Sequence, residues 1–124
     1  MEEVPKSVGA YRHIILAKMK DDVEPEEFEQ IMNAFANLPT LIPQIKSLHW
    51  GRDESVKNKT QGFTHIVEVT FDSHEDIAIY YDHPAHIKFA WELFPVVEDY
   101  LVINYKPTTS VEIPQKNNNN NSSS

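Results

Sequence analysis

The sequence contains no cysteine, only three glycines and no long uninterrupted run of apolar residues. Without cysteine, a disulfide framework, a thiol nucleophile and a cysteine-bound zinc site are all excluded. No stretch approaches the roughly 20 apolar residues that a membrane-spanning helix requires. The first residues also lack the basic region and apolar run of a secretory signal. These absences predict a cytoplasmic protein that does not enter a membrane.

Basic residues are scarce as well. Eleven Lys and Arg stand against nineteen Asp and Glu, which gives a net charge of −8 at pH 7. Nucleic acids and anionic membranes are bound by clustered Lys and Arg, so this balance argues against both as partners. The length of 124 residues favours one domain. We expect a flexible N-terminus at 1–10, the domain at 11–107, and a disordered low-complexity tail at 108–124.

Hydrophobic periodicity divides the domain into six expected elements. Alternating apolar residues predict strands at 11–19, 46–52, 63–71 and 100–105. Helical spacing predicts one helix that begins at Pro25 and ends before Pro39. A second helix is capped by Ser73, breaks, and restarts at Pro84.

The order strand, helix, strand, strand, helix, strand is that of an α+β, ferredoxin-like βαββαβ fold. Its four-stranded antiparallel sheet carries helices on one face only. We expect the other face to hold His13, Val67 and Val69, which are too apolar to leave in water. Packing two such faces together would form a dimeric α/β barrel, so the sequence predicts a homodimer.

A histidine and a tyrosine flank the expected restart at Pro84. If Pro84 is the first helical residue, His86 shares a helix face with Phe89 and Leu93. That face should point inward, and Tyr80 ends the preceding turn. Apolar surroundings would lower the imidazole pKa and keep it neutral, as a general base requires. The pair can equally be two core residues with satisfied hydrogen bonds.

Two further histidines, His13 and His65, alternate with aliphatic residues on strands that lie side by side in this fold. We predict that they converge with His86 and Tyr80 at one end of the sheet. A transition-metal site is not favoured, because His83 sits at the helix break and no carboxylate completes a ligand set.

Several segments in this order are characteristic of one family. They are residues 12–16, 48–51, 61–65, 69–71, 83–86 and 101–105. Through them the chain resembles the stress-responsive A/B barrel (Dabb) family over about residues 11–107. The resemblance implies small ferredoxin-like proteins that dimerise through their sheets.

The resemblance extends to plant members that cyclise polyketides. It implies a cofactor-free, lyase-type aldol condensation in which His86 abstracts the acidic proton between two carbonyls of a linear polyketide. Tyr80 would hold His86 or polarise the acceptor carbonyl. The cavity-lining histidines of the family match His13 and His65.

The substrate would lie between the sheet and the helices, where we expect Phe35, Phe89 and Trp91 to decide which small hydrophobic or polyketide ligand is accepted. An enzyme of this kind requires a pocket of a few hundred cubic ångströms that exposes His86 and Tyr80. A non-catalytic stress-response protein, acting through stable assembly or ligand binding, is the open alternative. A haem-degrading monooxygenase is disfavoured, since it would need a haem-sized pocket and an axial histidine.

Some plant members of this family also bind a structural magnesium ion through backbone carbonyls that follow the first helix. The corresponding stretch here is 39–45, and the candidate ligands are the carbonyls of Pro39, Ile42 and Ile45. This ion would be structural and would take no part in catalysis.

Overall fold

The computed structural model describes residues 10–108 and 113–114. The expected flexible N-terminus and low-complexity tail therefore lie almost wholly outside the described residues, and both stay predictions. None of the described helices is long and apolar enough to cross a membrane.

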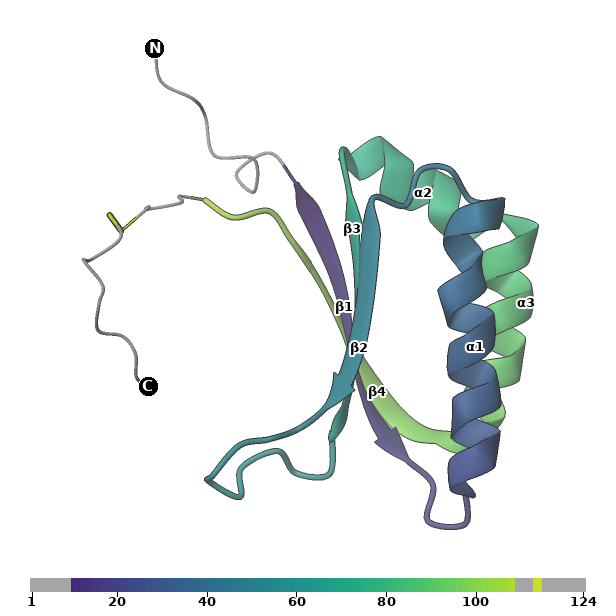
Figure 1. Cartoon of the computed structure of the whole chain (residues 1–124), viewed down its shortest axis with the longest axis vertical. Coiled ribbons are helices and arrows are strands. Elements are labelled where there is room, and N and C mark those ends of the chain that lie inside the picture. Colours follow the sequence, from purple (N-terminus) through teal and green to yellow (C-terminus); the bar gives the residue numbers. More distant parts are fainter. Residues whose placement is uncertain (1–9, 109–112, 115–124) are drawn as a thin grey trace.

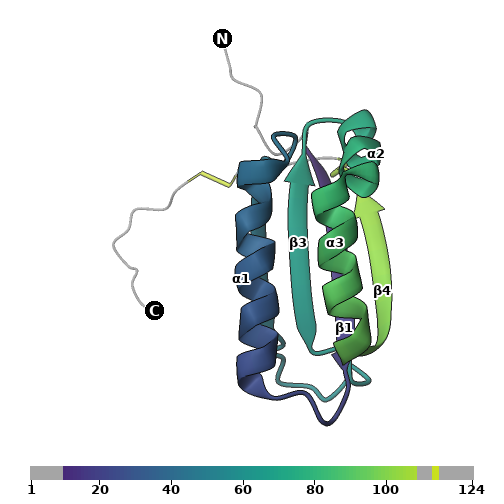
Figure 2. The same cartoon turned by 90° about the vertical axis from the view of Figure 1, so that its right-hand side faces the viewer.

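A single antiparallel sheet carries all of its helices on one face (Figures 1 and 2). The elements are β1 (Tyr11–Met19), α1 (Pro25–Leu41), β2 (Ser47–Arg52), β3 (His65–Phe71), α2 (His74–Asp82), α3 (Pro84–Leu93), the 3-10 turn η2 (Phe94–Val96) and β4 (Val97–Tyr105). The strand order is β2-β3-β1-β4. This confirms the predicted α+β, ferredoxin-like fold with its four-stranded sheet.

Two element boundaries differ from expectation by three residues. Pro39 does not end α1 but lies inside its last turn, and the helix continues to Leu41. A proline removes only its own N–H bond, and the next turn closes normally because Ile42 N–H donates to the Leu38 carbonyl at 2.8 Å. Burial of Leu38 and Ile42 holds this turn on the core. The last strand begins at Val97, three residues earlier than predicted.

The face of the sheet under the helices is not the one expected. His13 pairs with Val69 across β3, and both lie on the helix-covered face with exposures of 1% and 0%. Val67, on the same face, is 5% exposed. The prediction that these residues form the open face is therefore wrong. Strand alternation separates two faces, but a shift of one residue exchanges them.

The open face is nevertheless apolar, with different residues. It carries Ile14, Leu16, Ile66, Leu101, Ile103 and Tyr105. Leu101 and Ile103 of β4 are 48% and 46% exposed. An ion pair joins Arg12 to Glu68 on this face at 3.6 Å.

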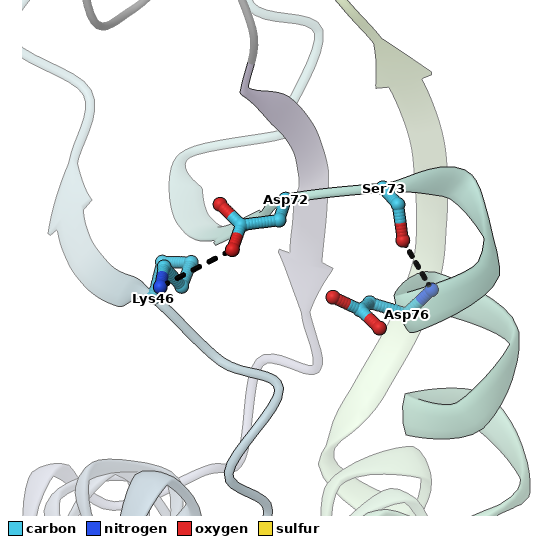
Figure 3. Close-up of polar contacts among 4 residues, drawn as sticks. All are labelled: Lys46, Asp72, Ser73 and Asp76. Carbon is cyan, nitrogen blue, oxygen red and sulfur yellow. Dashed lines mark hydrogen bonds and ion pairs between the residues drawn. The ribbon is translucent and has the colours of Figure 1, made fainter.

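Short polar contacts fix the start of α2, the helix that delivers Tyr80 to the site (Figure 3). Ser73 Oγ accepts the Asp76 N–H at 3.0 Å, which confirms the predicted cap. Asp72, which follows β3, pairs with Lys46 before β2 at 3.2 Å. The backbone entering α2 is therefore held on both sides.

Candidate functional site

The break between α2 and α3 places the candidate catalytic side chains. Pro84 is the first residue of α3, as predicted. The His83 ring caps this helix, because its Nδ1 accepts the Ala85 N–H at 3.0 Å. His83 is thus engaged as a structural cap, and the chain bends sharply enough for α3 to bring His86 back beside Tyr80.

Tyr80 and His86 are in direct contact. Their ring centroids are 4.3 Å apart, and Tyr80 is 1% exposed. Burial, followed by the neighbouring Tyr81, raises the pKa of the Tyr80 phenol, so it stays protonated at neutral pH. The Tyr80 ring therefore forms a neutral, rigid wall against the imidazole.

A hydrogen bond at Nδ1 orients the His86 ring. Its Nδ1 lies 3.3 Å from the Tyr81 carbonyl oxygen, so Nδ1–H donates there and Nε2 keeps a lone pair. Burial lowers the pKa of His86, an effect that the hydrogen bond to Tyr81 opposes and that His13 and His83 reinforce. A neutral imidazole with an unprotonated Nε2 has the form of a general base.

His13, which lies on strand β1, is likewise hydrogen-bonded through its Nδ1. Its Nδ1 lies 2.6 Å from Asn104 Oδ1 and 3.2 Å from the Tyr81 hydroxyl oxygen. An amide oxygen only accepts, so Nδ1 carries the proton. His13 Nε2 is buried and has no hydrogen-bond partner among the described residues. Burial lowers the pKa of His13, and the bond to Asn104 partly offsets this.

A cavity of about 310 Å³ lies between α2 and α3 on one side and β1 and β4 on the other. Its walls are the side chains of His13, Ile15, Ala17, Val67, Tyr80, Tyr81, His86, Phe89, Ala90, Leu93, Phe94, Val97, Tyr100 and Val102. Apart from the hydroxyl of Tyr100, the polar groups of this lining belong to His13, Tyr80, Tyr81 and His86, which lie together. This volume agrees with the few hundred cubic ångströms expected of a ligand site.

The structure brings only some of the candidate residues together. His13, Tyr80, His86 and Phe89 line the cavity. His65 does not, so its expected convergence with the others is wrong. It pairs with Ala17, four residues along β1 from His13.

His65 instead packs against Phe28, with ring centroids 4.7 Å apart, and borders a second cavity of about 640 Å³. Phe35 is fully buried in the core, against Phe89. Trp91 is 71% exposed on the outer side of α3. Neither Phe35 nor Trp91 lines the cavity beside His86.

Two residues of the site, Tyr81 and Asn104, are absent from the sequence-based candidates. Asn104 stands directly across from His13 in the pairing of β1 with β4. Aligning the two alternating strands would have indicated it, since a buried imidazole needs a partner. Tyr81 adjoins Tyr80, and only the exact end of α2 decides which hydroxyl reaches His13.

No group of three or more His, Cys, Asp or Glu side chains within 10–108 and 113–114 could hold a metal ion. The magnesium ligands predicted from the family are backbone carbonyls. Pro39 lies in the last turn of α1, and the Ile42 carbonyl accepts the Ile45 N–H at 3.2 Å. A carbonyl oxygen has a second lone pair, so this bond leaves a ligand position free. The magnesium site stays a prediction.

The sequence of this chain is similar to those of several known proteins. The sequence model of the Stress responsive A/B Barrel Domain (Dabb) matches residues 11–107. The stress-response A/B barrel domain-containing protein HS1 of Arabidopsis thaliana is 46% identical over 82% of this chain and 93% of its own length. Olivetolic acid cyclase of Cannabis sativa is 41% identical over 79% of this chain and 97% of its own.

Solved structures of similar chains have the same fold. A hydroxynitrile lyase from Passiflora edulis is 31% identical, with a TM-score of 0.77, and the match covers 85% of this chain and 99% of that one. A dimeric protein of ferredoxin-like fold from Bacteroides fragilis is 27% identical, with a TM-score of 0.63, over 79% and 96% of the two chains. Similar chains thus include two enzymes and a dimer.

Proposed function

Because the chain belongs to the stress-responsive A/B barrel domain family, we propose that it is a homodimeric, lyase-type enzyme of the polyketide-cyclase kind. The proposed reaction is a cofactor-free intramolecular aldol condensation of a linear polyketide in the cavity beside His86. The observation that carries the proposal is the pair of neutral imidazoles, His13 and His86, each with an unprotonated Nε2 at one end of an apolar cavity.

Proton transfer through His86 accounts for each step. Nε2 takes the acidic proton from the carbon between two carbonyls, and the resulting enolate carbon attacks the acceptor carbonyl carbon. The new alkoxide oxygen then takes the proton back from the imidazolium. Nε2 next removes the second proton from the same carbon and returns it to the departing hydroxyl, so water leaves and the condensation is complete. Tyr80 holds the ring by contact, and Tyr81, which is 38% exposed and lines the cavity, donates its hydroxyl proton to a substrate oxygen. General acid–base catalysis of this type contributes roughly 10²- to 10⁴-fold.

Two other functions are a non-catalytic stress-response role and haem degradation. A non-catalytic stress-response role is favoured by the name of the 46% identical HS1, which refers to stress response and no reaction. Haem degradation is not supported by the cavity beside His86. Its volume of about 310 Å³ lies at the small end of the range for ligand sites, which suits a small linear ligand better than a tetrapyrrole.

Dimerisation is part of the proposal. The open face of the sheet exposes apolar side chains of β4, including Leu101 and Ile103. A contiguous apolar face of this kind is typical of a self-association surface. The dimeric ferredoxin-like protein similar to this chain supports the same arrangement.

The test supplies a linear polyketide thioester to the wild type, to His86→Ala and to the exposed control His74→Ala. We expect cyclised product from the wild type and His74→Ala, and a loss of roughly 10²-fold or more in His86→Ala. Circular dichroism and thermal melting verify that each variant is folded. Equal product from His86→Ala and wild type would remove His86 from the mechanism. Absence of product from folded wild type across a panel of chain lengths would favour the non-catalytic role.

A further inference from the structure

The apolar end of the cavity is bordered by a stacked pair of aromatic rings, Phe94 of η2 and Tyr100 of β4. Their centroids are 5.6 Å apart and their planes differ by 21°. Both rings line the cavity, and they are 45% and 43% exposed. A half-exposed aromatic pair beside a cavity can extend its stack onto a third ring.

Small side chains keep the space beside these rings open. Ala17 of β1 lies directly across from Tyr100 in the sheet, and Ala90 lies one helical turn before Phe94. Both alanines line the same cavity. Methyl groups at these two positions leave room next to the rings that a larger side chain would fill.

The distance between the polar and the aromatic ends follows from the backbone. Tyr100 stands four residues from Asn104 along β4, as Ala17 does from His13 along β1, which is about 13 Å of strand. On the other wall, eight residues separate His86 from Phe94, or about 12 Å at a helical rise. Both walls therefore give about 12 to 13 Å as the distance between the polar end and the aromatic end of the cavity.

We infer that the ligand of this cavity carries an aryl ring that stacks on Phe94 and Tyr100 while its enolisable, oxygen-bearing end lies against His13 and His86. The inference rests on the proposed function and narrows its substrate class. The preferred chains are aryl-substituted β-dicarbonyl compounds, and alkyl-substituted ones are the poorer ligands.

Binding of a matched pair of compounds tests this preference without any turnover. The pair is 6-phenylhexane-2,4-dione and 6-cyclohexylhexane-2,4-dione, which share the dicarbonyl head and the carbon count. Hydrophobicity alone favours the saturated ring, whereas stacking favours the flat one. We expect the wild type to bind the phenyl compound about two- to tenfold more tightly.

The variants separate stacking from shape. Phe94→Leu and Tyr100→Leu should abolish the preference, and the control Tyr100→Phe should retain it. Equal binding of the two compounds by the wild type, no binding of either, or a preference that survives in both leucine variants would overturn the inference. His86→Ala is measured in parallel. An aryl preference without any turnover by the wild type would reject the proposed reaction but leave the aryl site intact.

Discussion

The two faces of the sheet are built from the same alternating strands but are completed in different ways. On the helix-covered face, His13 and Val69 are almost fully buried by the chain's own helices. On the open face, Ile14 and Leu16 of the same central strand β1 remain partly exposed, and Leu101 and Ile103 of the edge strand β4 are about half exposed. Apolar content is similar on both faces, so it does not decide which one the chain covers itself.

The polar groups of the two faces differ more than the apolar ones. On the covered face, His13 Nδ1 is held by Asn104, and its Nε2 is buried without a hydrogen-bond partner among the described residues. On the open face, Arg12 pairs with Glu68 at 3.6 Å, a charged pair within an apolar surface. In the proposed function, the covered face serves a small molecule and the open face serves a second copy of the protein.

A charged substitution on the open face of the sheet should have the largest effect, which is loss of the dimer. We expect Ile103→Glu to convert the dimer to monomer at micromolar concentration, because the symmetric contact would bury two carboxylates without partners. Sedimentation velocity measures the change. Trp91→Glu, on the exposed outer side of α3, is the matched control and should stay dimeric. A monomeric wild type, or dissociation by Trp91→Glu alone, would contradict the assignment of the face.

On the covered face, Asn104 should determine which nitrogen of His13 carries the proton. Asn104→Leu removes the acceptor and should lower product formation roughly tenfold, since the neutral ring then samples both tautomers. Asn104→Asp keeps an acceptor and adds a negative charge, which favours the imidazolium. The proposed function needs both imidazoles neutral, so we expect the acid limb of the pH–rate profile to move to higher pH as the pKa of His13 rises.

The imidazole nitrogen shifts of His13, measured by NMR, report the tautomer independently of turnover. Asn37→Asp, the same change on the exposed surface of α1, is the control and should move neither the shifts nor the profile. If Asn104→Asp leaves the His13 resonances and the pH profile unchanged, Asn104 is a packing residue only.

Sequence reasoning predicted the order of the elements because periodicity and proline positions are local signals. Pro84 and the helical spacing after it placed His86 correctly beside Tyr80. The covered face, by contrast, depends on how the helices cross the sheet, and alternation carries no information about that. The same limit explains His65, because neighbouring strands were predicted but not the offset that separates it from His13 along β1.

Asn104 and Tyr81 were missed for a related reason. Their roles come from pairing across the sheet and from the last residue of a helix, and both are decided by tertiary structure. The sequence could give the types of residue that transfer protons, but not which nitrogen of each ring is left free.

The smallest expected effect concerns stability as a function of pH. Burial lowers the pKa of His13 in the folded protein below its unfolded value of about 6.5. Above that value both states are neutral and the ring has no pH-dependent effect. As the pH falls below it, the unfolded chain takes up a proton that the folded protein resists, so stability is lost at up to about 1.4 kcal/mol per pH unit.

Urea unfolding at pH 7.5 and 5.5, at one fixed protein concentration, measures this loss. His13→Gln should unfold with a shallower pH dependence than the wild type, whatever its stability at pH 7.5, because the titrating group is gone. The exposed His74→Gln should keep the wild-type dependence. An identical slope in His13→Gln and wild type would mean that the ring is solvated in the folded protein. In that case the covered face does not exclude water from His13, and the proposed chemistry lacks the dry environment on which it depends.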